Sequence, residues 1–69
     1  MLKPSEQEEM ERLRGVLGTF PEGTETRTTQ RIARELLLGG SFFWNGARCM
    51  PYAKPVGAGV YAITVTKNR

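Results

Sequence analysis

The sequence of 69 residues contains no histidine and a single cysteine, Cys49. One cysteine excludes an internal disulfide, and one thiol without histidine is a poor basis for a zinc site. General acid–base catalysis at neutral pH relies on histidine or on paired carboxylates in a pocket, and neither pattern is present. A lone cysteine on a strand is most often a small buried side chain. We therefore predict a protein without catalytic activity, metal ion or cofactor.

Long apolar runs are also absent. No stretch approaches the roughly 20 apolar residues that a membrane span needs, and the first residues lack the apolar core of a signal peptide. Together with the lone thiol, this predicts a cytoplasmic protein that does not enter a membrane. A chain this short buries only about 60% of the surface of its unfolded form. A partner or a second copy would add buried surface, so a homodimer is one expectation.

Acidic residues are missing from the second half of the chain, where none follows Glu35. Residues 1–26 carry a balance of −3, whereas residues 27–69 carry +6. Such an asymmetry is typical of a protein that binds nucleic acid or docks on an acidic surface. A simpler interpretation, solubility combined with charge complementarity at helix ends, also fits the numbers.

The residues that are present predict a single α+β domain over 1–69, with the element order ααβββ. A capping box formed by Ser5 and Glu8 predicts a first helix over about 5–18. A second helix over about 28–38, with Thr28 as its N-cap, ends at Gly39-Gly40. A three-stranded antiparallel β-meander over about 41–66 follows, and both helices are expected to pack on one face of it.

The meander contains a strong hairpin signal, Asn45-Gly46, because a type I′ turn needs positive φ at both central residues. Counting outward from this turn places Phe42, Trp44, Ala47 and Cys49 on one face. In the second hairpin, a loop over 56–59 would pair Tyr52 with Ile63. The apolar face of that hairpin would then lie opposite Phe42 and Trp44. Either a bulge at Pro51 switches the faces, or two aromatic side chains are left on the outer side.

Arginines recur on the second predicted helix, where positions 27, 31 and 34 would share one side. The run from Thr28 to Gly40, followed by strands that end in 59–64, resembles the recognition helix and wing of winged-helix proteins. That resemblance implies DNA binding by a helix in the major groove, although the usual domain has three helices and two are predicted here. We expect a small basic DNA-binding regulatory protein, and the candidate nucleic-acid contacts are Arg27, Gln30, Arg31, Arg34, Arg48 and Lys54. The simplest alternative for the arginine stripe is a solvated helix face.

A second hypothesis is a small adaptor or inhibitor, of the kind encoded by bacteriophages and mobile elements, that binds a host protein. Tryptophan, tyrosine and arginine dominate the binding energy of protein interfaces. An aromatic surface on the outer side of the meander would then supply the anchors, namely Phe42, Trp44 and Tyr52.

Overall fold

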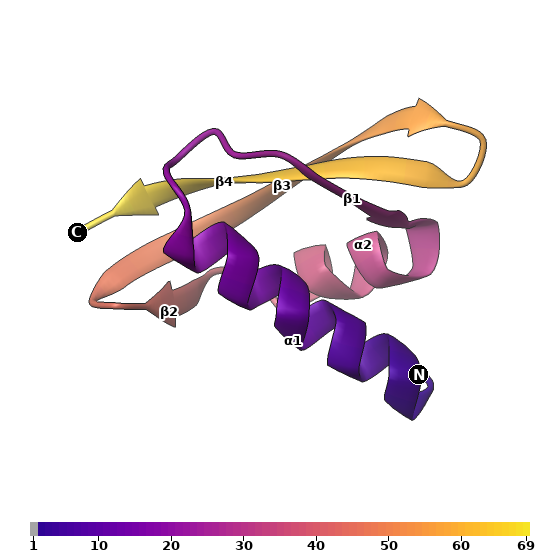
Figure 1. The fold of residues 1–69 in the computed structure, drawn as a ribbon, viewed down its shortest axis with the longest axis horizontal. Helices are drawn as coiled ribbons and strands as arrows, with labels where there is room; N and C mark the ends of the chain where they lie inside the picture. Colours follow the sequence, from indigo (N-terminus) through magenta and orange to yellow (C-terminus); the bar gives the residue numbers. More distant parts are fainter. Residues whose placement is uncertain (1) are drawn as a thin grey trace.

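The computed structural model describes residues 2–69 as two helices and one four-stranded sheet. The elements are α1 (Pro4–Thr19), β1 (Thr26–Thr29), α2 (Gln30–Leu38), β2 (Phe42–Trp44), β3 (Ala47–Gly57) and β4 (Val60–Asn68). The sheet is antiparallel with the order β1-β4-β3-β2, and both helices lie on one side of it (Figure 1). The prediction of an α+β domain is confirmed. The predicted three strands and the order ααβββ are wrong, because β1 is a fourth strand between the helices.

β1 occupies a segment where the sequence suggested a loop and the start of a helix. Its residues pair with β4, from Thr26 opposite Ile63 to Thr29 opposite Val60. Thr29 then caps α2, because its Oγ1 accepts a hydrogen bond from the Ile32 amide at 3.4 Å. The predicted cap at Thr28 is therefore wrong by one residue. Arg27 belongs to a strand and not to α2.

α1 begins at Pro4, one residue before the predicted start, and the predicted capping box of Ser5 and Glu8 is wrong because the N-cap lies two residues before Ser5. Lys3 is the N-cap, and its backbone N–H donates to Glu6 Oε1 at 2.9 Å. Pro4 takes the first helical position, where its missing N–H leaves no intrahelical bond unmade. Leu13 and Leu17 of this helix, which lie one turn apart on the same side, are fully buried.

The first hairpin forms as predicted. Asn45 and Gly46 have φ values of 50° and 78°, and Phe42 pairs with Cys49 and Trp44 with Ala47. The second hairpin has a different register, in which Tyr52 pairs with Thr64. The register shifts between Pro55 and Gly57, so one extra residue enters β3 near the turn. A slip of one residue exchanges the two faces of a strand, which is why the predicted apolar face is wrong.

Side chains therefore continue to alternate between the two faces of β3, without a change of face at Pro51. Neither the predicted bulge at Pro51 nor the predicted pair of outward-facing aromatic side chains is needed to explain the sheet. The face under the helices holds the side chains that make up the core with α1 and α2, among them Cys49, Ile63 and Val65. Leu17, Ala33 and Leu36 meet them from the helices. The opposite side of the sheet, here called the open face, has no helix over it. It includes Arg27, Phe43, Arg48, Met50, Tyr52, Lys54, Ala62, Thr64 and Thr66.

The outer edge of β3 extends beyond the short β2 and carries two prolines, Pro51 and Pro55. Proline has no N–H to donate to a neighbouring strand, so it weakens an edge as a template for further pairing. This edge is consequently a poor place for a second copy to extend the sheet. Neither helix in residues 2–69 has the length and apolar character needed to cross a membrane.

Candidate nucleic-acid interface

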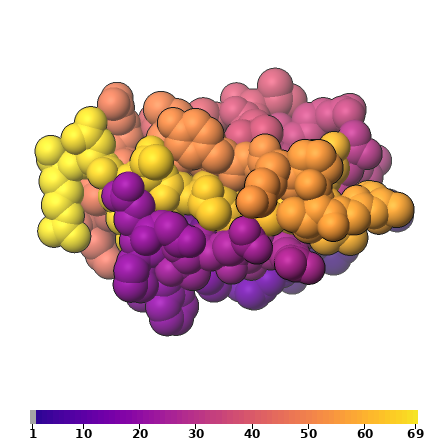
Figure 2. Space-filling model, turned by 90° about the horizontal axis from the view of Figure 1, so that it is seen from above, coloured from indigo at the N-terminus to yellow at the C-terminus, as the bar shows by residue number. Residues whose placement is uncertain are grey.

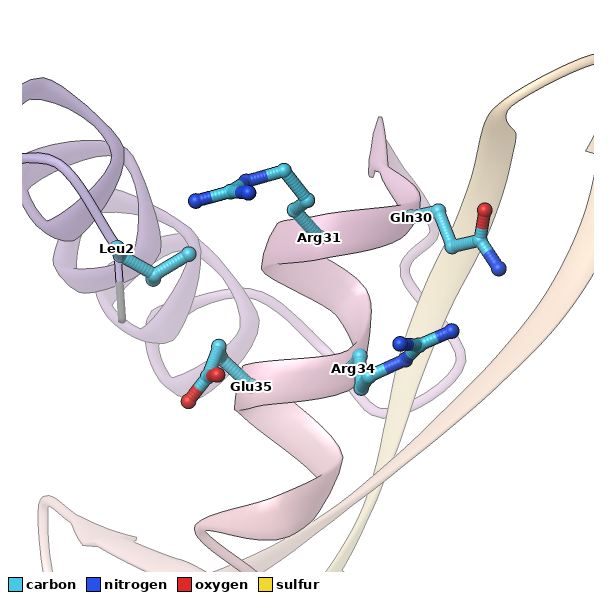
Figure 3. A pocket seen from close by; sticks show the side chains of 5 residues that line it. All are labelled: Leu2, Gln30, Arg31, Arg34 and Glu35. Carbon is cyan, nitrogen blue, oxygen red and sulfur yellow. The ribbon is translucent and has the colours of Figure 1, made fainter.

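α2 carries three of the predicted contact residues, Gln30, Arg31 and Arg34. They line a hollow of about 270 Å³ together with Leu2 and Glu35 (Figure 3). Figure 3 shows Arg31 extending toward α1, whereas Gln30 and Arg34 extend away from that helix. The predicted stripe therefore does not form as one surface. Glu35 adds a negative charge to the same hollow.

Arg31 links the two helices. Its Nε lies 3.1 Å from Glu6 Oε2, and its Nη2 lies 3.3 Å from Glu6 Oε1. The Lys3 backbone N–H and the Arg31 guanidinium hold the pKa of Glu6 below its ordinary value of 4.5. The guanidinium of Arg31 is thus already balanced by a carboxylate, and releasing it for a phosphate would cost this contact.

The other three predicted basic residues lie together on the open face. Arg27 and Lys54 both pair with Ala62, from opposite sides of β4. Since adjacent strands are about 4.8 Å apart, their backbones lie roughly 10 Å from each other. Arg48 lies further along β3, opposite Asn68, and all three basic side chains are exposed. Figure 2 looks onto this side of the molecule, where β4 in yellow runs between β3 in orange and the purple segment that leads into β1.

Exposed aromatic rings accompany these charges. Phe43 is 75% exposed and pairs directly with Arg48, and Tyr52 is 53% exposed on the same face. Arg48 and Tyr52 are four residues apart in β3, which corresponds to about 13 Å along the strand. The open face therefore carries Arg48, Tyr52 and Lys54 along β3, with Phe43 of β2 beside Arg48.

The other aromatic residues proposed as anchors, Phe42 and Trp44, lie on the opposite side of the sheet, under the helices. Both pack against the hydrophobic core. Trp44 Nε1 donates a hydrogen bond to Thr19 Oγ1 of α1 at 3.2 Å. The structure therefore does not bring Phe42, Trp44 and Tyr52 together on one surface, and the shared outer face expected for them is absent.

A shallow hollow of about 150 Å³ lies on the open face over β3 and β4, beside the residue that precedes β1. Ala62 and Thr64 of β4 contribute to it, together with Tyr52 and Lys54 of β3. Glu25, which precedes β1, lines it as well. Ala62, which lies between Arg27 and Lys54 in the sheet, lines the hollow with a small side chain that leaves space above β4.

One basic residue of the sheet does not contribute its positive charge to the open face. The four strands contain four basic residues and no acidic residue. Lys67, however, donates its Nζ to the carbonyl oxygens of Gly18 and Phe20 at 2.9 and 2.6 Å. Its ammonium group therefore contacts the C-terminal end of α1. The basic residues of the sheet that remain on the open face are Arg27, Arg48 and Lys54.

Sequence reasoning missed Phe43, Thr64 and Glu25 as parts of this surface. A signal existed for Phe43, because the Asn45-Gly46 turn places it opposite Arg48 and on the other face from Phe42. No comparable signal existed for Glu25 and Thr64, which are brought together by the pairing of β1 with β4.

Within residues 2–69, no three histidine, cysteine, aspartate or glutamate side chains gather into a group that could hold a metal ion. No protein-family model, no curated protein and no solved structure matches the chain.

Proposed function

We propose that the protein binds nucleic acid, without catalysing a reaction on it, and that the open face of the sheet is its binding surface. One observation carries this proposal: Phe43 and Tyr52 expose their rings on the same face as Arg27, Arg48 and Lys54. Cationic side chains that track phosphates, combined with aromatic rings that stack on bases, are the two components of single-strand binding surfaces.

The ligand that this face suits best is a single strand. An exposed ring gains little from a duplex, whose bases are paired and stacked on one another. Unpaired bases can stack on Phe43 and Tyr52, and such stacking contributes about 1–3 kcal/mol per base. The threonine hydroxyls of β4 on this face, Thr64 and Thr66, can donate to or accept from base edges. A regulatory role would then follow from occupancy of the nucleic-acid strand by the protein. The open face would hold the strand in place without catalysing a reaction on it.

Duplex DNA binding by α2 is the second candidate, and it corresponds to a winged-helix-like mode. The observation in its favour is that α2 exposes Gln30 and Arg34 while the β3–β4 hairpin projects beyond the rest of the sheet (Figure 1). Gln30 would read a base and Arg34 would contact a phosphate. The pairing of Arg31 with Glu6 and the exposed apolar Leu37 and Leu38 on α2 weigh against this mode.

Protein binding through the same open face is the remaining alternative. Phe43, Met50 and Tyr52 are all exposed there, and these residue types are enriched at protein interfaces. This adaptor hypothesis uses Tyr52 in common with the nucleic-acid hypothesis. It does not use the positive charge.

Salt-dependent binding separates the three candidates. Fluorescence anisotropy with a labelled single strand of mixed sequence should show binding that weakens with salt, by about 0.7 in log–log slope per phosphate contact. The double variant Arg48→Gln, Lys54→Gln should reduce this slope by about 1.4 units. Arg34→Gln removes one charge on α2 and is the matched control, which should leave the slope unchanged.

The same experiment also contains the contradicting outcomes. Tighter binding of a duplex, with loss of that binding in Arg34→Gln, would favour the winged-helix-like mode. No binding of either ligand at about 50 mM salt would overturn the nucleic-acid proposal, since electrostatic binding is strongest at low salt. A complex with a protein from nuclease-treated lysate that is lost in Tyr52→Ala would then support the adaptor hypothesis.

A further inference from the structure

The hollow on the open face contains an acidic residue where a phosphate-binding surface would exclude one. Glu25 lines the hollow beside Lys54, and the strands around it carry no other carboxylate. A negative charge here repels the phosphate backbone, so it lowers affinity unless it contacts another part of the ligand. The position of Glu25 therefore calls for a partner other than a phosphate.

The carboxylate of Glu25 is only weakly engaged within the protein. Arg27 Nε lies 4.0 Å from Glu25 Oε1, at the limit of an ion pair, and the side chains are 67% and 40% exposed, respectively. An exposed ion pair at this distance contributes little. An ionised carboxylate can only accept hydrogen bonds, so its oxygens select a ligand group that donates.

The walls and floor of the hollow suit a base. Tyr52 pairs with Thr64 across β3 and β4, and Ala62 lies two residues before Thr64 on the same face. The phenol ring of Tyr52 forms one wall, Glu25 forms another, and the small Ala62 leaves the floor low. A base that stacks on Tyr52 would present its edge across β4 to Glu25, with Arg27 and Lys54 on either side for the flanking phosphates.

We propose that this hollow takes an unpaired base that carries an exocyclic amino group, stacked on Tyr52 and donating that amino group to Glu25. The inference rests on the proposed function and adds a base preference to it. Among the pyrimidines it selects cytosine, whose N4 amino group donates, over uracil, whose O4 at the same position only accepts. A carbonyl oxygen facing the Glu25 carboxylate leaves two acceptors without a hydrogen between them.

The test compares two octamers with identical deoxyribose backbones, oligo-dC and oligo-dU, which differ in the base edge. Anisotropy titrations at pH 7.5 and low salt should give at least about tenfold tighter binding of oligo-dC, the value of one hydrogen bond to a charged group. Glu25→Gln should bring the two affinities to within about twofold. It should do so partly by strengthening oligo-dU binding, because the glutamine amide can donate to O4 and a repulsive charge is removed.

The matched control is Glu8→Gln, which removes the same charge from an exposed position on α1. It should leave the preference for oligo-dC at the wild-type level. Glu25→Ala should also lose the preference, and circular dichroism should show that each variant keeps the wild-type fold. These results together would support the inference.

Three outcomes would overturn this inference, and they are distinguishable. Equal binding of both octamers by the wild-type protein would exclude selection by Glu25 and leave the proposed function standing. A preference for oligo-dC that survives Glu25→Gln would likewise assign it to another residue. Failure of the wild-type protein to bind either octamer would overturn both this inference and the proposed function.

Discussion

The backbone of Gly18 in α1 lies directly against the indole of Trp44 in β2. A Cβ atom added to Gly18 would stand 2.3 Å from Trp44 Cγ and 2.6 Å from Trp44 Cβ. These are the atoms of the side chain nearest the β2 backbone, so they cannot move aside without moving the strand. The contact sets the distance between α1 and the sheet, and the hydrogen bond from Trp44 to Thr19 lies beside it.

This contact predicts opposite effects for two glycines of the same helix. Gly18→Ala should destabilise the protein by about 1–3 kcal/mol, because overpacking outweighs the gain in helix propensity. At Gly15 an added Cβ would lie 3.6 Å from the nearest Trp44 atom, an ordinary contact. Gly15→Ala should therefore stabilise the protein by up to about 1 kcal/mol. Urea unfolding followed by circular dichroism measures both, and equal effects would contradict the packing argument.

The two hairpins show which parts of the fold the sequence determines locally. Asn45-Gly46 has one favourable turn geometry, and that geometry fixed the pairing of Phe42 with Cys49 correctly. The segment 54–59 has several possible loops, because its prolines and glycines do not signal where an extra residue enters the strand. The register shift between Pro55 and Gly57 decided the faces of Met50 and Tyr52, and only the folded sheet reveals it.

The sequence predicted the residue types of the candidate site better than it predicted which of these residues lie together. Arg27, Arg48 and Lys54 do share a face, but the sequence placed Arg27 on a helix with Arg31 and Arg34. The four residues of β1, Thr26–Thr29, have no helical or alternating pattern of apolar residues, so their pairing with β4 decides their structure. Glu6 lies in the first turn of α1, where a carboxylate is locally favourable, whereas its contact with Arg31 depends on how the two helices pack.

Trp44 and Phe43 are neighbours with opposite roles, which a pair of alanine substitutions should reveal. Trp44→Ala should cost about 2–4 kcal/mol, because the indole packs between α1 and the core. Phe43→Ala should change stability by less than about 0.5 kcal/mol, since the ring is solvent-exposed. It should nevertheless weaken binding of a single strand by about 1–3 kcal/mol.

Thermal unfolding and anisotropy titration of the same two preparations separate these effects. Loss of binding without loss of stability is expected for Phe43→Ala alone. A destabilised Phe43→Ala protein, or a Trp44→Ala protein as stable as the wild type, would contradict the assignment of the two faces.

The contact between Glu6 and Arg31 predicts how stability depends on acid. The pKa of Glu6 is lowered in the folded protein by the Lys3 backbone N–H and by Arg31. The unfolded chain therefore binds a proton more readily, and the contribution of Glu6 to stability is present above the ordinary pKa of 4.5 and lost as pH falls through the lowered value. Glu6→Gln should be less stable than the wild type at pH 7, and the two stability curves should converge as the pH falls below the lowered pKa of Glu6.

Arg31→Gln tests whether the salt bridge contributes to this pH dependence. The backbone contact from Lys3 remains in that variant, so the stability curve should fall less steeply with acid than in the wild type but more steeply than in Glu6→Gln. Urea unfolding at a series of pH values from about 3 to 7 measures all three curves. A Glu6→Gln curve parallel to that of the wild type would show that the carboxylate has no lowered pKa.

Lys67 and Lys54 are both on long strands, yet only Lys67 should matter for stability. Its Nζ donates to two carbonyl oxygens at the end of α1, at 2.9 and 2.6 Å, where the helix leaves acceptors without intrahelical partners. Lys67→Met keeps most of the side-chain bulk and removes both donors, so it should cost about 1–3 kcal/mol. Lys54→Met removes the same charge from the open face and should leave stability within about 0.5 kcal/mol of the wild type.

Urea midpoints at matched slopes measure the stability of both variants. The effects of the two substitutions on binding of a nucleic-acid strand should be reversed, with the larger loss of salt dependence in Lys54→Met. If Lys67→Met instead weakened binding without changing the urea midpoint, its ammonium would belong to the binding surface and not to the end of α1.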